Sequence, residues 1–243
     1  MMRLDRWLVA LGQGSRSQVQ KLIKSGAVQV SGQIVRDPAQ SFTGDETLAL
    51  HGAPLDGRLT RHVMLHKPAG LLTAARDRKQ PPVMDLLPPA YASRGCMPVG
   101  RLDKDTTGLL LLTTDGELNH RLLAPGRHVD KTYRATVDGL LTDEHVAAFA
   151  EGLHLSDFDA QPATLVIVSS DEAESEALVT VHEGKFHQIK RMFEAVGRQV
   201  TALHRETFGS LTLDEGLTPG QWRELTDAEL TALYQDAQMK EPL

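Results

Sequence analysis

The sequence has 243 residues, and 41% of them are hydrophobic. It contains a single cysteine, Cys96, and its formal net charge is −6. This length and apolar content predict one large or two smaller globular domains, and the lone cysteine excludes an internal disulfide. No apolar stretch approaches the roughly 18 residues of a transmembrane helix, and Asp5 and Arg6 interrupt any signal-peptide core, so we expect a cytoplasmic protein.

Residues 1–50 are predicted to form a small unit of two helices followed by a β-hairpin. Apolar residues recur at helical spacing over 3–11, and a second helix is expected between an N-cap at Ser15 and Gly26. Alternating apolar residues over 28–35 predict the hairpin.

Basic side chains are concentrated on these two predicted helices. Positive side chains supply most of the non-specific affinity of proteins for RNA, so this face is a predicted phosphate-binding surface. A solvated basic face on a small domain is the simpler alternative. The basic residues of this predicted phosphate-binding surface are Arg3, Arg6, Arg16, Lys21 and Lys24.

A second domain is predicted over residues 62–243, after a linker at 51–61 that lacks periodicity and contains Gly and Pro. It opens with a strand that ends at Lys67, and its last helix has a capping box of Thr226 and Glu229. Because strands and helices do not alternate strictly, we predict an α+β fold with a mixed, mainly antiparallel sheet flanked by helices. Further strands are expected at 109–113, 132–137, 164–168, 177–181 and 200–204, and helices at 116–123, 143–150, 187–196 and 226–236.

The net charge disfavours a nucleic-acid partner at face value, but the charges are unevenly distributed. Residues 143–176 contain nine acidic residues and no Lys or Arg, and residues 214–243 contain seven acidic against two basic residues. The rest of the chain therefore carries +8, and it contains the motifs described below. Acidic segments are most often solvated surface; keeping RNA off the wrong face is a second interpretation.

The most informative segment runs from Gly100 to Thr113 and reads GRLDKDTTGLLLLT. It is a polar loop, bounded by glycines, that leads into a fully apolar strand. A carboxylate here, Asp103, is held by a rigid scaffold, which suits a nucleophile or a base. On physical grounds alone, a structural loop in which Asp103 caps a turn and pairs with Arg101 is the simpler interpretation.

Two parts of the sequence resemble known families. The stretches Arg3-Leu4-Asp5, Ser15-Arg16 and Gly26 to Gly32 resemble the S4 RNA-binding domain, which implies an S4-like ααββ domain over residues 1–50. The segment from Gly100 to Thr113 resembles the signature of the pseudouridine synthases, in the branch that includes the ribosomal small-subunit and large-subunit enzymes. This resemblance implies that Asp103 is the catalytic aspartate and that Arg101 fills the space left by a flipped nucleotide.

Further motifs extend the resemblance to about residue 235. Lys67-Pro68-Ala69-Gly70 matches an architectural motif of the family. The resemblance implies that Tyr133 packs against the flipped base and that Leu203 helps to wall the pocket; a core tyrosine is the alternative for Tyr133. It also implies that Lys190 pairs with the catalytic aspartate, although Lys lacks the bidentate fork of the Arg that many members carry. Arg191 is the competing candidate for that pairing and otherwise an RNA-binding residue.

The resemblance implies isomerisation of uridine to pseudouridine in ribosomal RNA, with the small-subunit 16S RNA favoured by the version of the motif at 187–192. The target nucleotide must be flipped out of the folded RNA, at a cost of a few kcal/mol. Asp103 then attacks the sugar, abstracts a sugar proton or adds to the base, and the sequence leaves all three open. We expect no cofactor and no metal, ribosomal RNA or an assembly intermediate as the partner, and a monomer.

Other functions remain open from the residues alone. A synthase that acts on large-subunit 23S RNA is one, and a non-catalytic RNA-binding or ribosome-assembly protein, which would not need Asp103, Tyr133 and Lys190 together, is another. A glycosidase with Asp103 and Asp105 as its carboxyl pair is the third. Glycosidase carboxyls lie roughly 5 to 9.5 Å apart, which two residues of one loop can reach.

Overall fold

The computed structural model describes residues 1–44, 46–75, 77 and 79–239, and the chain divides into two compact units. One unit contains residues 1–61 and 88–96, and the other contains residues 62–87 and 97–243. Within the described residues, no helix is long and apolar enough to cross a membrane.

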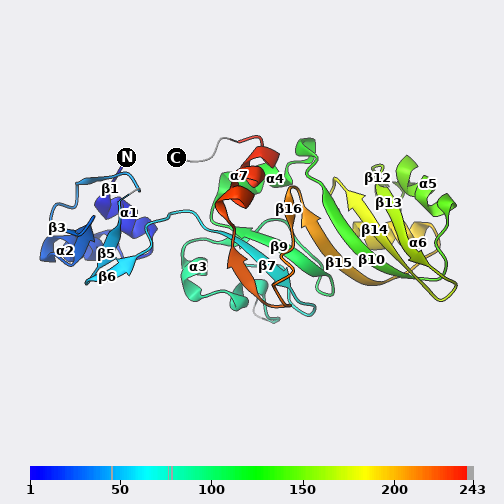
Figure 1. Ribbon diagram of the computed structural model, residues 1–243, viewed down its shortest axis with the longest axis horizontal. Helices are drawn as coiled ribbons and strands as arrows, with labels where there is room; N and C mark the ends of the chain where they lie inside the picture. Colours follow the sequence, from blue (N-terminus) through cyan, green and yellow to red (C-terminus); the bar gives the residue numbers. More distant parts are fainter. Residues whose placement is uncertain (45, 76, 78, 240–243) are drawn as a thin grey trace. The chain divides into compact units, whose positions relative to one another are not determined.

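The first unit packs two helices on a small antiparallel sheet, as predicted for an ααββ domain (Figure 1). Ser15 caps the second helix through a capping box with Gln18, and Gly26 ends it in the left-handed conformation. The core combines buried apolar residues of both helices with those of the strands; they include Leu4, Leu8, Val19, Ile23, Val28, Val30 and Phe42. The elements are β1 (Met2–Arg3), α1 (Leu4–Ala10), α2 (Arg16–Ser25), β2 (Val28–Val30), β3 (Gln33–Val35), β4 (Ser41–Phe42), β5 (Leu48–Leu50), β6 (Ala53–Leu55) and α3 (Pro89–Ser93).

The predicted linker at 51–61 belongs largely to this unit. Ala53–Leu55 is β6 and pairs with β5, and Gly57 accepts a hydrogen bond of 2.7 Å from the Trp7 indole. Leu59 packs on the core, and Arg61 is buried and pairs with Asp56 at 2.7 Å. The prediction was wrong here because a three-residue edge strand containing Pro54 shows no periodicity in the sequence.

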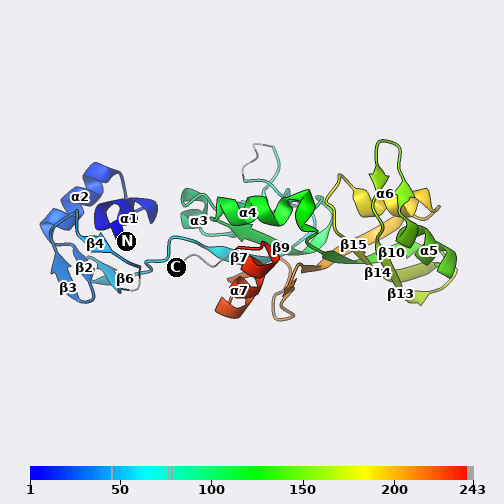
Figure 2. The ribbon, with the colours of Figure 1, turned by 90° about the horizontal axis from the view of Figure 1, so that it is seen from above.

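The second unit is built on a long mixed sheet, which Figures 1 and 2 show from two directions. In the described part of the chain its main strands run in the order β13-β14-β10-β15-β9-β7-β17, with β16 on β15 and β8 on β9. All neighbours are antiparallel except β9 and β15. The strands are β7 (His62–Lys67), β8 (Met97–Pro98), β9 (Thr107–Thr113), β10 (Lys131–Asp138), β13 (Thr164–Ser170), β14 (Glu174–Val181), β15 (Val200–Phe208), β16 (Leu211–Thr212) and β17 (Trp222–Glu224), beside a separate hairpin of β11 (Leu153–His154) and β12 (Asp159–Ala160).

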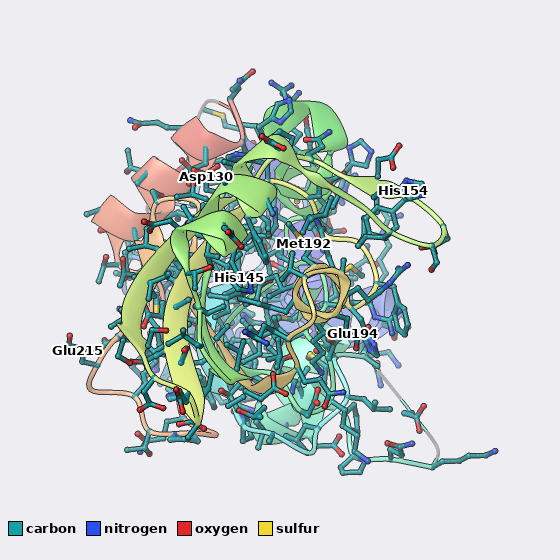
Figure 3. The ribbon with its side chains drawn as sticks, turned by 90° about the vertical axis from the view of Figure 1, so that its right-hand side faces the viewer. Asp130, His145, His154, Met192, Glu194 and Glu215 are labelled. Carbon is teal, nitrogen blue, oxygen red and sulfur yellow. The ribbon has the colours of Figure 1, made fainter. Side chains whose placement is uncertain are left out.

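Helices cover two regions of this sheet. Leu118, Leu122 and Leu233 bring α4 and α7 into one core with Leu109 and Leu111 of β9. At the other end, Figure 3 shows α6, with Met192 and Glu194 labelled, and the β11–β12 hairpin, with His154 labelled. The elements are the 3₁₀ helices η1 (Val83–Leu86) and η2 (Pro125–Arg127) and the α-helices α4 (Gly116–Leu123), α5 (Asp143–Glu151), α6 (Gln188–Ala195) and α7 (Asp227–Asp236). The predicted strands, helices and α+β class are confirmed.

The parallel pairing of β9 and β15 sets the geometry of the functional region. His204 lies opposite Thr107, and Arg205 lies opposite Gly108. Gly108 has a φ of +103°, and a Cβ there would lie 2.3 Å from the Arg205 carbonyl oxygen. The glycine of the Gly100–Thr113 segment therefore lets the two strands meet, which joins the polar loop to the strand that carries Leu203.

Candidate active site

A cleft with about 440 Å³ of space, partly open to solvent, brings together residues that are far apart in the sequence. The loop between β8 and β9 contributes Arg101 and Asp103, β10 contributes Tyr133, α6 contributes Lys190 and β15 contributes Leu203. These are the five residues to which the sequence analysis assigned catalytic or substrate-binding roles. The complete lining is Arg101, Leu102, Asp103, Thr106, Tyr133, Val181, Glu183, Gly184, Lys185, His187, Gln188, Ile189, Lys190 and Leu203.

The loop that carries Asp103 is held by the Lys67–Gly70 motif. The Lys67 side chain is fully buried, and its ammonium donates to the carbonyl oxygens of Pro68 (3.0 Å), Lys104 (3.2 Å) and Thr106 (2.9 Å). The Gly70 N–H also donates to the Lys104 carbonyl at 2.7 Å. Burial lowers the pKa of Lys67 to about 8. The motif thus has the architectural role that was expected. Its lysine contributes three hydrogen bonds to backbone carbonyls, and Gly70 contributes one.

Thr73 fixes the same loop from its other side. Its hydroxyl donates to the Leu102 carbonyl at 2.8 Å and accepts from the Leu102 N–H at 3.2 Å. The backbone on both sides of Asp103 is therefore hydrogen-bonded to the segment that follows β7, so the carboxylate projects from a fixed position.

Asp103 is partly buried, with 26% of its side chain exposed, and two groups from the α6 region face it. His187 Nε2 lies 3.5 Å from Oδ1, and Lys190 Nζ lies 3.8 Å from Oδ2. Lys190 makes its shorter contacts with Asp105, at 2.7 Å to both oxygens, and this ammonium holds the pKa of Asp105 below its usual value. One ammonium thus lies beside both carboxylates of the loop, and among the described residues Asp103 pairs with His187 and Lys190 rather than with Arg101.

Arg191, the alternative partner for Asp103, points elsewhere. Its guanidinium pairs with Asp157, donates to the Ser156 hydroxyl at 3.1 Å and lies 4.9 Å from the centre of the Phe158 ring. All three partners belong to the connection between β11 and β12. Of the two predicted candidates, Lys190 is therefore the one placed beside the carboxylate.

Tyr133 and Leu203 form the apolar wall of the cleft. Both are nearly buried, with 9% and 8% of their surfaces exposed, and they project from the adjacent strands β10 and β15. Behind them Arg205, only 2% exposed, donates to the Leu109 carbonyl at 2.7 Å and to the Tyr133 hydroxyl at 3.5 Å. The wall thus presents a planar ring, held from behind, to whatever enters the cleft.

The five basic residues of the first unit that were predicted to bind phosphate are exposed, as an RNA-contacting role requires. Arg3 donates to both oxygens of the buried Asp5 at 3.0 and 2.9 Å, and Arg16 lies 3.8 Å from the same carboxylate. The hydrogen bonds from Arg3, with one from Gln20, hold the pKa of Asp5 well below its usual range, and Arg3 is the main cause. Asp5 thus orients Arg3 and Arg16, two of the five predicted phosphate-binding side chains; the other three are Arg6, Lys21 and Lys24.

Two neighbours of Asp103 were not foreseen. His187 was predicted at the start of the helix over 187–196, but its contact with Asp103 was not; it has a left-handed φ of 51°, and its Nε2 lies 3.5 Å from Asp103 Oδ1. Lys67 was predicted as part of an architectural motif, but its three hydrogen bonds to backbone carbonyls were not. Such contacts depend on tertiary packing and carry no specific signal in the sequence. Among the described residues, no three His, Cys, Asp or Glu side chains group in a way that could hold a metal ion.

Residues 61–195 match the RNA pseudouridylate synthase family, and residues 2–48 match the S4 domain. The chain is 40% identical to an uncharacterised RNA pseudouridine synthase of Bacillus subtilis, covering 96% of this chain and 98% of that protein. It is 37% identical to the ribosomal small subunit pseudouridine synthase A of Escherichia coli, covering 96% and 100% of the two chains.

The solved structures agree with the sequence comparison. A pseudouridylate synthase crystal structure matches 96% of this chain and all of its own length, with a TM-score of 0.66 and 34% identity. The family match includes the Asp103 loop, Tyr133 and Lys190, and the matched relatives extend over nearly the whole chain. The protein belongs to the RNA pseudouridylate synthase family and combines a synthase domain with an S4 domain.

Proposed function

We propose that this enzyme isomerises uridine to pseudouridine in small-subunit ribosomal RNA, with Asp103 as the catalytic carboxylate. The observation that carries the assignment is the position of Asp103, on a loop fixed by Lys67 and Thr73, in one cleft with Tyr133 and Leu203. The small-subunit substrate rests on relatives of that name in Salmonella typhimurium, at 38% identity, and Escherichia coli, at 37%.

The reaction needs only what the cleft offers. The bond from the ribose C1′ to N1 of the base breaks, the base rotates, and C1′ bonds to C5. C5 loses its proton and N1 gains one, so atoms and electrons balance without an oxidant or a reductant. Tyr133 would stack on the extruded base and recover part of the cost of flipping, and Arg101, which is exposed, would occupy the vacated space.

The glycosidase alternative fits the geometry less well. A glycosidase needs one carboxyl that stays protonated so that it can donate to the leaving oxygen. Lys190 contacts both oxygens of Asp105 and lowers its pKa, which is the opposite of what a general acid requires. Asp105 therefore serves to hold Lys190 in place, and Asp103 is the carboxylate of this loop that is left for chemistry.

The test is release of tritium from small-subunit RNA labelled at uridine C5, with the wild-type protein and Asp103→Ala compared. We expect release by the wild type alone, on free RNA or on a partly assembled particle. Release by both proteins would assign the chemistry to another residue. Release by neither, on either substrate, would contradict the proposed activity and favour a non-catalytic RNA-binding protein. We also expect the protein to be cytoplasmic and monomeric. Sedimentation of the active protein would check that it is a monomer.

A further inference from the structure

Phe186 is exposed to an extent that is unusual for a large apolar side chain in this protein. It is 72% exposed, whereas Phe42, Phe149, Phe193 and Phe208 are fully buried. Its ring lies parallel to that of His187, with 3.8 Å between the ring centres and 19° between the planes. One face of Phe186 is therefore covered by an imidazole, and the side chain is otherwise open to solvent.

This stacked pair lies at the edge of the active site. His187 lines the cleft, and its Nε2 is 3.5 Å from Asp103 Oδ1. Phe186 is the next residue along the chain, yet it is not part of the cleft lining. The His187 ring thus has the Asp103 carboxylate at its edge and Phe186 on its face, so one ring separates Phe186 from Asp103.

The cleft beside the pair is lined by basic as well as acidic side chains. Lys185 precedes Phe186 in the chain, and the cleft contains Lys190 and the exposed Arg101. An exposed aromatic ring close to positive side chains is an arrangement with which proteins bind single-stranded RNA, since the cations meet phosphates while bases stack on the ring. The adjacent cleft is the proposed binding site of an anionic RNA substrate. We therefore infer RNA, rather than a protein, as the partner of Phe186.

We propose that the open face of Phe186, supported by His187, stacks on an unpaired nucleobase that neighbours the flipped uridine in the RNA substrate. This inference rests on the proposed function and adds a second nucleotide-binding position to it. Flipping leaves the neighbouring bases partly unstacked, and Phe186 would replace the lost stacking partner. The role is one of binding and register, so its loss affects KM and leaves the rate at saturating RNA unchanged.

The first experiment compares Phe186→Leu, which keeps an apolar side chain but removes the ring, with Phe186→Tyr, which keeps the ring. We expect Phe186→Leu to raise KM for a stem-loop substrate by about 5- to 150-fold, the range expected for loss of one base–aromatic stack. Its kcat should stay within about twofold of the wild type, and Phe186→Tyr should match the wild type. Val166→Ala, at an exposed apolar position on β13, is the control and should change neither value.

The second experiment identifies the stacked base. Substrates with an abasic site at each nucleotide next to the target are tested with wild type and Phe186→Leu. At the stacked position the abasic site should raise KM for the wild type but not further for Phe186→Leu, because both changes remove the same contact. Additive effects at every position, or an unchanged KM in Phe186→Leu, would overturn the inference. An inactive wild type would instead mean that the proposed function has failed.

Discussion

Lys67 shows how much one buried side chain contributes to the placement of Asp103. In Lys67→Met the carbonyl oxygens of Pro68 and Thr106 lose their ammonium donor, while Lys104 keeps the Gly70 N–H. A buried polar group without a partner costs about 1–3 kcal/mol, so we expect a loss of stability of that order. Because the loop would shift, we also expect kcat to fall roughly 10- to 100-fold.

Thermal unfolding and single-turnover tritium release would measure these two effects. Lys104→Met is the matched control, because its side chain is exposed and only its backbone oxygen holds the loop. If both variants lost activity equally, with unchanged stability, positive charge near the loop rather than the hydrogen bonds of Lys67 would be what matters.

At the scale of single residues, the sequence predicted which residues form the active site better than it predicted the contacts between them. Asp103, Arg101, Tyr133, Lys190 and Leu203 follow from motif resemblance, and all of them line one cleft. The sharing of Lys190 between two carboxylates depends on where α6 lies relative to the loop, over 85 residues away in the chain. Such a distance is fixed by tertiary packing, which no local pattern encodes.

At the scale of elements, Glu229 ties the start of α7 to β17. Its carboxylate accepts from both terminal nitrogens of Arg223 at 2.7 Å and from the Thr226 N–H at 2.8 Å. These bonds, chiefly those from Arg223, lower the pKa of Glu229 from 4.5 to about 2. A carboxyl with a lowered pKa stabilises the fold above its unfolded value, and this contribution is lost as the pH falls from 4.5 towards 2.

We therefore expect Glu229→Gln to be less stable than the wild type by about 1–2 kcal/mol above pH 5, after allowance for partial exposure. The difference should shrink as the pH falls and vanish near pH 2. Urea unfolding across pH 3 to 7 would measure it. Glu117→Gln removes an exposed carboxylate paired with Arg121 and should cost less than about 0.5 kcal/mol. A difference in stability that stayed constant with pH would contradict the proposed coupling between protonation of Glu229 and stability.

Which elements could be predicted depends on their length. Strands of six to nine residues and helices with a clear cap, such as α2 and α7, were predicted to within a few residues. The three-residue strands β2 and β3 were predicted because they alternate across one hairpin, whereas the short strands β4, β6 and β17 were missed because each alone contains too few residues to show alternation. They form through pairing with a neighbour, so their signal lies in the partner strand.

At the scale of the whole molecule, the basic residues of the S4 domain are expected to supply RNA affinity while the synthase domain supplies chemistry. A truncation at residue 50 is a poor test, because it would leave β6 without its partner β5 and expose the core that Leu55 and Leu59 cover. Substitution of the exposed Arg6, Lys21 and Lys24 by Gln keeps the domain folded, since their side chains lie outside its core.

The triple variant should bind small-subunit RNA with a shallower dependence on salt. Each lost phosphate contact lowers the slope of log K against log salt by roughly 0.7 to 0.9, so three contacts change it by about 2 to 3. The rate at saturating RNA should stay that of the wild type, because the Asp103 loop is untouched. A second triple variant on the synthase domain, Arg121→Gln with Arg198→Gln and Lys79→Gln, controls for net charge. An unchanged slope would mean that these side chains form a solvated face, and an equal fall in kcat would mean that the two domains do not divide binding from chemistry.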